Sequence, residues 1–204
     1  MKKIKLSLVI ALLGMVSLVG AQNTSFSIKG GLNMSNFYGD ELSDKNMKTG
    51  FHIGVGADFE FAPNMAIQSG LLFTSKGAKY TTDLVSTELN ANANFLQLPL
   101  HFAYKIDVMP GTRVVLHAGP YVAYGIGGKT SAGNVEVDTF KDDAFLDVLN
   151  GLKPFDAGIG LGVGAEFGPI LLDLGWDMGL TNLSRVSGYD VKTQNAYLSV
   201  GFKF

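Results

Sequence analysis

The stretch FDAGIGLGVGAEF, residues 155–167, decides the fold. Apolar residues alternate with polar residues or glycines along its whole length. The apolar set is Phe155, Ala157, Ile159, Leu161, Val163, Ala165 and Phe167. A repeat of two residues puts one set on each face of a β-strand, whereas a helix would not separate the two sets in this way. The stretch therefore predicts a strand with one apolar face and one polar or empty face.

The same alternation recurs along the chain and returns at its end, where Ala196, Leu198, Val200, Phe202 and Phe204 share a face. The predicted strands are roughly 25–34, 49–61, 66–76, 94–105, 112–125, 155–167, 170–180 and 195–204. Each has about the 9 to 11 residues that a tilted strand needs to cross a bilayer. The apolar faces carry no charge, which is what a lipid-facing surface requires.

Side-chain size indicates which face is inside. The polar face is rich in glycine, whereas the apolar face is crowded with Phe, Leu, Ile and Trp. The interior of an eight-stranded barrel is barely wide enough for its own side chains, so the small residues belong inside and the bulky ones in lipid. The sequence therefore predicts an all-β, eight-stranded, antiparallel, up-and-down transmembrane β-barrel.

The connections between the predicted strands alternate in length. Those after the second, fourth and sixth strands are short, and the others are longer, as in outer-membrane barrels with short periplasmic turns and long extracellular loops. Both termini are therefore expected in the periplasm. The longest connection, 126–154, contains a segment, 138–149, whose pattern favours a short amphipathic helix.

Residues 1–21 are typical of a secretory signal peptide. Lys2, Lys3 and Lys5 precede the apolar run 6–19, and small residues precede Gln22. The run is shorter than the roughly 20 residues of a spanning helix. Residues 22–204 are then a single barrel domain, and no cysteine is present to form a disulfide or carry a lipid.

The charge of the mature chain argues against a nucleic-acid partner. The signal segment holds three of the 16 basic residues and none of the 18 acidic ones. After cleavage, 13 basic and 18 acidic residues remain, which gives a formal charge of −5. Binding to phosphates needs clustered lysines and arginines.

Four segments resemble a known family: FLQLPLHFAYKI (95–106), HAGPYVAYGIGG (117–128), residues 155–167 and the terminal GFKF. Together they are similar to the PorT-type outer-membrane β-barrel family, whose members are often called porin-family proteins. The resemblance implies an eight-stranded barrel in the outer membrane of a Gram-negative cell. It implies no single activity, although the namesake of the family is an accessory of a protein secretion system.

Inward positions carry charges and histidines that we interpret as a polar network in the lumen. Its members are Lys29, Glu60, His101, Arg113, His117, Glu166, Asp173, Asp177 and Lys203. We expect opposite charges on neighbouring strands to pair, as Lys29 with Glu60, Arg113 with Glu166, and Asp173 with Lys203, because an unpaired buried charge is costly. A plugged lumen is then favoured over an open channel.

Three other kinds of site have weaker support in the sequence. His101 and His117 could face each other and seed a metal site, but no cysteine supports it. The loop carboxylates Asp138, Asp142, Asp143 and Asp147 do not have EF-hand spacing. Ser69 and Ser75 are the outward hydroxyl candidates, and no outward histidine stands beside them as a base. We predict no enzyme, no cofactor and no metal.

Phe202 and Phe204 form an aromatic end that resembles the assembly signal read by the barrel-insertion machinery. Outer-membrane lipid and that machinery are therefore the expected partners. For function, the leading hypothesis is a structural or surface-interacting barrel. The alternatives are an accessory subunit of a secretion machine, with protein partners there, or a narrow diffusion channel for small solutes.

Overall fold

The computed structural model describes residues 24–39, 46–82, 87–132, 135–140, 152–185, 188 and 190–204. The signal segment 1–21 and most of the segment expected to be helical, 138–149, lie outside the described residues. No helix long and apolar enough to cross a bilayer occurs in the described part of the chain.

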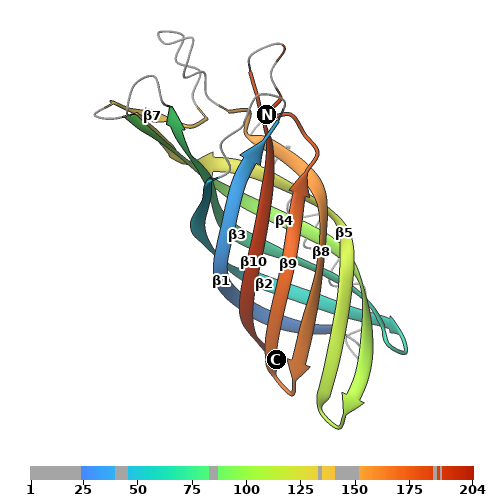
Figure 1. Ribbon diagram of the computed structural model, residues 1–204. Helices are drawn as coiled ribbons and strands as arrows, with labels where there is room; N and C mark the ends of the chain where they lie inside the picture. The colour runs from blue at the N-terminus through green and yellow to red at the C-terminus, as the bar shows by residue number, and fades with distance from the viewer. Residues whose placement is uncertain are drawn as a thin grey trace, which may run out of the picture.

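One antiparallel sheet contains all the strands, and eight long strands form its barrel (Figure 1). The barrel strands are β1 (Thr24–Tyr38), β2 (Asn46–Ala62), β3 (Met65–Thr82), β4 (Thr87–Met109), β5 (Thr112–Gly127), β8 (Phe155–Phe167), β9 (Ile170–Gly179) and β10 (Lys192–Lys203). Neighbours in sequence pair with each other, and β1 pairs with β10 to close the ring. The predicted fold class is confirmed.

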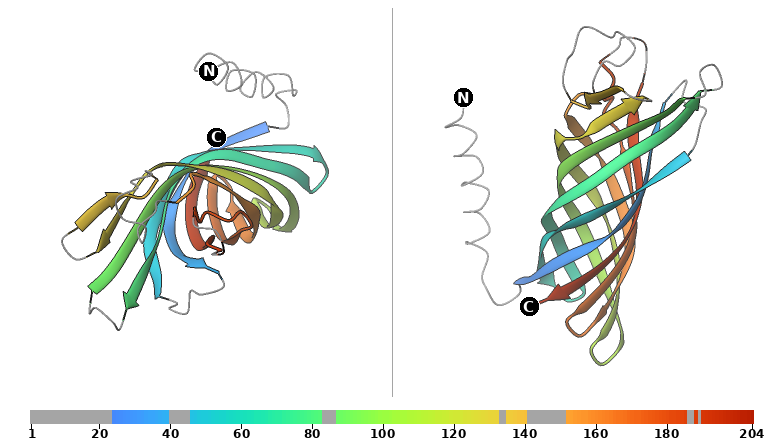
Figure 2. Two further views of the ribbon diagram at one scale, coloured as in Figure 1. Left: turned by 90° about the horizontal axis from the view of Figure 1, so that it is seen from above. Right: turned by 90° about the vertical axis from the view of Figure 1, so that its left-hand side faces the viewer.

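The structure contains a small hairpin that the sequence pattern does not predict. Strands β6 (Lys129–Ala132) and β7 (Val135–Asp138) pair with each other, and β6 also pairs with the start of β4. The hairpin stands at the end of the barrel opposite the C-terminus (Figure 2). Strands β3 and β4 are also longer than expected, because their polar residues beyond the apolar face continue the ladder to Thr82 and Thr87.

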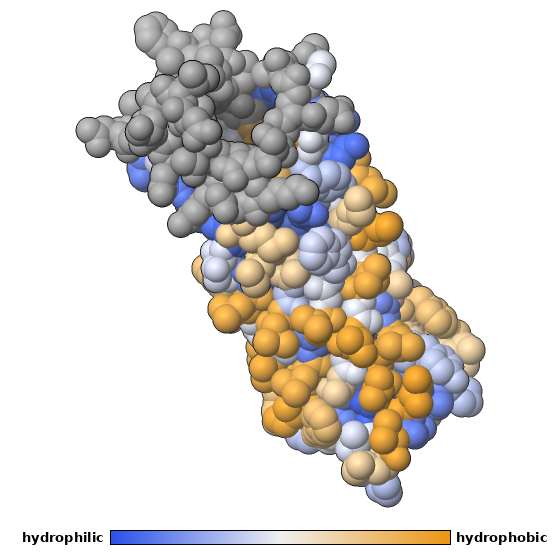
Figure 3. All heavy atoms as spheres, in the orientation of Figure 1, coloured by the Kyte–Doolittle hydropathy of each residue, from blue (hydrophilic) through white to orange (hydrophobic). Residues whose placement is uncertain are grey.

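The outer wall is apolar, as the alternation predicts. Leu174, Leu161, Leu198 and Val200 each expose more than half of their surface, which in this fold faces lipid. Apolar side chains gather over the lower part of the barrel (Figure 3). The glycines of β8 and β9 lie inside, where side chains from other strands occupy the space. A Cβ added at Gly175, for example, would lie 2.3 Å from the Tyr197 ring.

Candidate functional site

Polar side chains fill the barrel interior in layers, and the layer nearest the chain termini is a group of charges that we call the charged cluster. It comprises Asp58, Glu60, Lys105, Arg113, Glu166 and Lys203. Lys105 stands at its centre with a fully buried side chain. Its ammonium lies 2.9 Å from Asp58, 2.7 Å from Glu60 and 3.1 Å from Glu166. One buried cation thus links carboxylates from β2 and β8.

Glu166 is the second centre of the charged cluster. It lies opposite Arg113 in the β5–β8 register, and the guanidinium donates to it at 2.6 Å, the pairing that the sequence indicates. Lys203 donates to the same carboxylate at 2.7 Å. Arg113 also lies 2.9 Å from Glu60. The three cations and three carboxylates therefore neutralise one another across five strands.

Two of the expected pairings are wrong. Lys29 lies opposite Gly54, well above Glu60, which instead reaches Lys105 and Arg113. Asp173 contacts His117 rather than Lys203, whose partner is Glu166. The error arises because long side chains in a narrow, tilted barrel reach beyond the adjacent strand. Lys105 itself was missed, although it shares the inward parity of His101 on β4.

A second layer, near mid-barrel, contains three histidines. The Nδ1 atoms of His101 and His117 are 3.0 Å apart, and their rings stack with centroids separated by 5.1 Å. His117 Nε2 lies 2.8 Å from Asp173. His52 is bonded at both ring nitrogens, to Asn33 at 2.7 Å and Ser199 at 2.6 Å. The structure thus brings His101, His117 and Asp173 together in one chain of contacts.

Asp177 lies close to this layer and is almost completely buried. Gln97 donates to its carboxylate at 2.9 Å. Above it, Asp156 accepts from Thr193 at 2.8 Å and from Tyr121 at 3.3 Å. Lys76 lies 3.7 Å from Asp156 and over the rings of Phe95 and Tyr121. Polar contacts therefore continue from the charged cluster toward the far end of the barrel.

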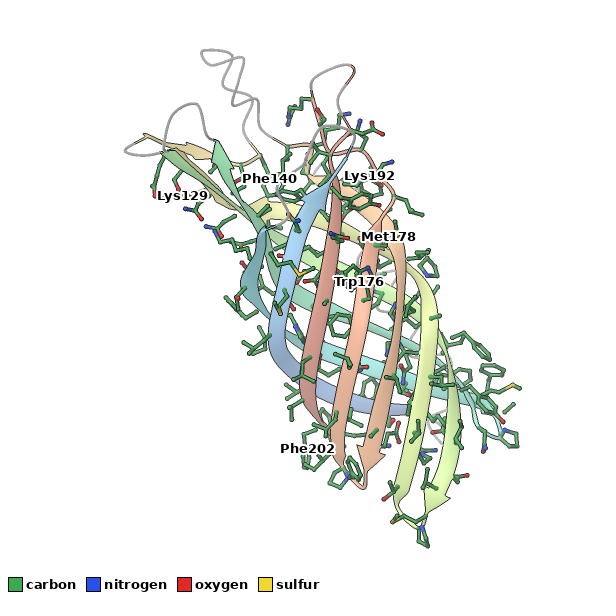
Figure 4. All side chains as sticks on the ribbon, viewed as in Figure 1. Lys129, Phe140, Trp176, Met178, Lys192 and Phe202 are labelled. Carbon is green, nitrogen blue, oxygen red and sulfur yellow. The ribbon has the colours of Figure 1, made fainter. Side chains whose placement is uncertain are left out.

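An apolar cluster fills the interior at that far end, which the sequence reading did not foresee. Its buried members are Phe37, Ala78, Ala93, Phe95, Tyr121, Ala123 and Leu183. Phe140, which follows β7, packs on this cluster and stands edge-on to Phe95, with centroids 5.5 Å apart. Figure 4 labels Phe140 at the upper end of the barrel and Phe202 at the lower end. Part of the longest connection therefore returns to the barrel mouth.

The remaining candidate residues have the following surroundings. Among the described residues, no three histidine or carboxylate side chains converge as a ready-made metal site. The Ser69 hydroxyl donates to the Pro99 carbonyl at 2.9 Å. At the chain end, Phe204 is 68% exposed, and its backbone exchanges hydrogen bonds with Phe26 on β1.

Comparisons with known proteins agree with this architecture. No curated protein sequence matches the chain significantly. Neisserial surface protein A is similar in structure, with a TM-score of 0.51 and 12% identity over 90% of this chain and 100% of that chain. Ail of Yersinia pestis matches with a TM-score of 0.49 and 13% identity, covering 90% of this chain and 100% of that one. Outer membrane protein W of E. coli matches with a TM-score of 0.46 and 15% identity, covering 91% of this chain and 100% of that one.

At such identities, the likeness to Neisserial surface protein A shows a shared fold alone. The family is shown by the sequence itself, because the model for the outer membrane protein beta-barrel domain matches residues 20–185. With its closed eight-stranded ring and apolar outer wall, the chain belongs to the outer membrane protein beta-barrel domain family.

Proposed function

We propose that this protein is an integral outer-membrane barrel with a blocked lumen, whose contacts are made by its extracellular loops. The observation that carries the proposal is the filling of the interior at both ends. Lys105 ties together three carboxylates near the termini, and the apolar cluster occupies the opposite end. Water and ions would have to displace both to pass, and buried, paired charges resist such displacement.

The orientation that we propose follows the rule for bacterial barrels. The termini and the turns at 62–65, 109–112 and 167–170 lie in the periplasm of a Gram-negative cell. The β6–β7 hairpin and the other long connections lie outside. The signal peptide 1–21 would direct export of the chain, and its cleavage would release the mature protein into the periplasm, where the insertion machinery would bind the segment that ends in Phe204.

A surface role is supported by the hairpin, because it extends the sheet with polar side chains. Lys129 and Glu136 pair at 2.7 Å on that hairpin, with 70% and 59% of their side chains exposed. We propose neither an enzymatic activity nor a cofactor, and no nucleic-acid partner. A PorT-type role as an accessory subunit of a secretion machine is the second candidate, and it rests on the resemblance of residues 95–106 and 117–128.

Planar-bilayer recording tests the blocked lumen. Purified protein should give no steady single-channel steps. Steps that change in size with Glu166→Ala would instead establish a diffusion channel whose wall includes the charged cluster. A matched Glu136→Ala variant, which alters a carboxylate on the exposed hairpin, controls for nonspecific leakage.

Two cell experiments test orientation and partners. An epitope inserted between β6 and β7 should be labelled on intact cells, and labelling only after the outer membrane is opened would reverse the orientation. Affinity capture from detergent-solubilised outer membranes separates the two roles. Stoichiometric secretion components would favour the accessory subunit, and a lone barrel would favour the surface-interacting role.

A further inference from the structure

Aspartates outnumber lysines among the interior side chains around the middle of the barrel. There, the lysines Lys29 and Lys76 face three aspartates, Asp156, Asp173 and Asp177. Lys76 lies beside Asp156, and Asp173 contacts His117. Within the described part of the chain, Asp177 has no lysine or arginine nitrogen within 4.0 Å. With neutral histidines, these five side chains carry one excess negative charge, and Asp177 is the aspartate among them that contacts neither a lysine nor a histidine.

Hydrogen-bond acceptors without partners surround the same carboxylate. They are His101 Nε2, Gln97 Oε1, Asp177 Oδ1 and Asn195 Oδ1. Their residues are only 3–6% exposed and line a single mid-barrel cavity of about 60 Å³. A buried polar group left without a partner destabilises the folded state. Four such atoms in one cavity indicate an occupant that the protein atoms alone do not supply.

The histidine contacts define what His101 offers to that occupant. An ionised Asp173 can only accept, so His117 Nε2 carries a hydrogen. In a neutral His117, Nδ1 is then an acceptor, and the hydrogen in the 3.0 Å contact belongs to His101 Nδ1. His101 Nε2 therefore presents a lone pair, and the buried amides also present oxygens.

Gly160 leaves room between two of these acceptors. A Cβ added there would lie 2.6 Å from Asp177 Oδ1 and 2.9 Å from His101 Nε2. Both atoms thus border the same small space on the β8 wall. A cavity of about 60 Å³ has room for several water molecules. Such waters alone would donate to the acceptors without bringing any positive charge.

We propose that this cavity binds one divalent first-row transition-metal cation, with His101 Nε2 and Asp177 Oδ1 as its protein ligands. Amide oxygens of Gln97 and Asn195, together with water, complete the coordination. Imidazole nitrogen with carboxylate and carbonyl oxygen suits Zn²⁺ and its neighbours better than Mg²⁺ or Ca²⁺. The cation brings positive charge to a region where aspartates outnumber lysines, and it uses lone pairs that otherwise have no partner. Glycine at position 160 keeps the space open.

Zinc binding to the intact barrel tests the proposal. Protein purified in detergent is stripped with EDTA, loaded with Zn²⁺, separated from free metal and analysed for zinc per chain. Calorimetry gives the dissociation constant, and Co²⁺ in place of Zn²⁺ reports nitrogen and oxygen ligands through its visible spectrum. We expect one ion per chain. Asp177→Asn and His101→Gln should each weaken binding by more than about 100-fold, beyond the effect of losing an outer-shell contact.

His52→Gln is the matched control, since His52 lines the same cavity but both of its nitrogens are already bonded. It should keep the zinc. Gly160→Ala should weaken binding without removing a ligand, and the heat-dependent gel mobility of every variant shows whether it is folded. No zinc in the folded wild type would overturn the proposal and leave a proton or water in the cavity. Equal zinc in wild type and Asp177→Asn would mean surface binding and would overturn it as well.

Discussion

Replacing Lys105 with methionine should destabilise the barrel more than any other loss of a single charge in the interior. Glu166 would keep Arg113 and Lys203, and Glu60 would keep Arg113. Asp58 would keep only the amide of Gln68, at 2.7 Å. Removing one partner of a buried ion pair costs about 3–5 kcal/mol. The folding equilibrium constant should therefore fall by a factor of roughly 150 to 5,000.

Urea unfolding in lipid vesicles measures this change. The only tryptophan, Trp176, shares the parity of the exposed Leu174 on β9, so its fluorescence reports transfer from lipid to water. Lys129→Met, which breaks an exposed pair, should stay within about 1 kcal/mol of wild type. Adding Asp58→Asn to Lys105→Met should recover part of the loss. If Lys105→Met matched Lys129→Met, the charged cluster would not hold the barrel together as described.

Three further predictions concern the wall, the chain end and the mouth. Leu174→Arg should lower the free energy of unfolding in lipid by about 2–4 kcal/mol, whereas Phe167→Arg beside the β8–β9 turn should lower it by about 0–1 kcal/mol. Equal losses would contradict a position of Leu174 near the bilayer midplane and of Phe167 near the interface. Phe204→Ala should refold in detergent like wild type but accumulate less in the outer membrane, as quantified by immunoblot; unchanged amounts would remove its role in assembly. Phe140→Ala should lower the free energy of unfolding by less than the roughly 3–5 kcal/mol of a fully buried phenylalanine, because its ring is only partly buried. No loss in the urea assay would mean that the mouth does not depend on this ring.

The fold was predictable because alternation acts locally. In residues 155–167, the polarity of each side chain indicates which face of the strand it occupies. Arg113 and Glu166 both have inward parity on neighbouring strands, and the β5–β8 register places them opposite each other. The interior contacts were less predictable, because they depend on how far each side chain extends across the lumen and not only on which strands are neighbours. Glu60 on β2 meets Lys105 on β4 across the short inward residues of β3, such as Ala66, and no neighbouring-strand rule finds that pair.

The apolar cluster was missed for a different reason. The expectation that bulky residues lie outside holds through most of the barrel, but Phe95 and Tyr121 occupy inward positions and are 0% and 2% exposed. Their parity with His101 and His117 was available in the sequence. What the sequence lacked was the return of Phe140 to the mouth, which makes an aromatic interior favourable there by supplying apolar partners.

The backbone pairing of Phe26 with Phe204 has a consequence for the life of the chain before it reaches the membrane. Strand β1 can pair with β10 only after the chain has been made as far as Phe204. This pairing closes a loop of roughly 180 residues, and the entropic cost of closing a loop grows only slowly with its length. The ring therefore cannot form during synthesis or translocation. Until Phe204 pairs with Phe26, strand edges and apolar side chains stay exposed to water, so we expect the unfolded chain to be prone to aggregation and to need rapid insertion or protection.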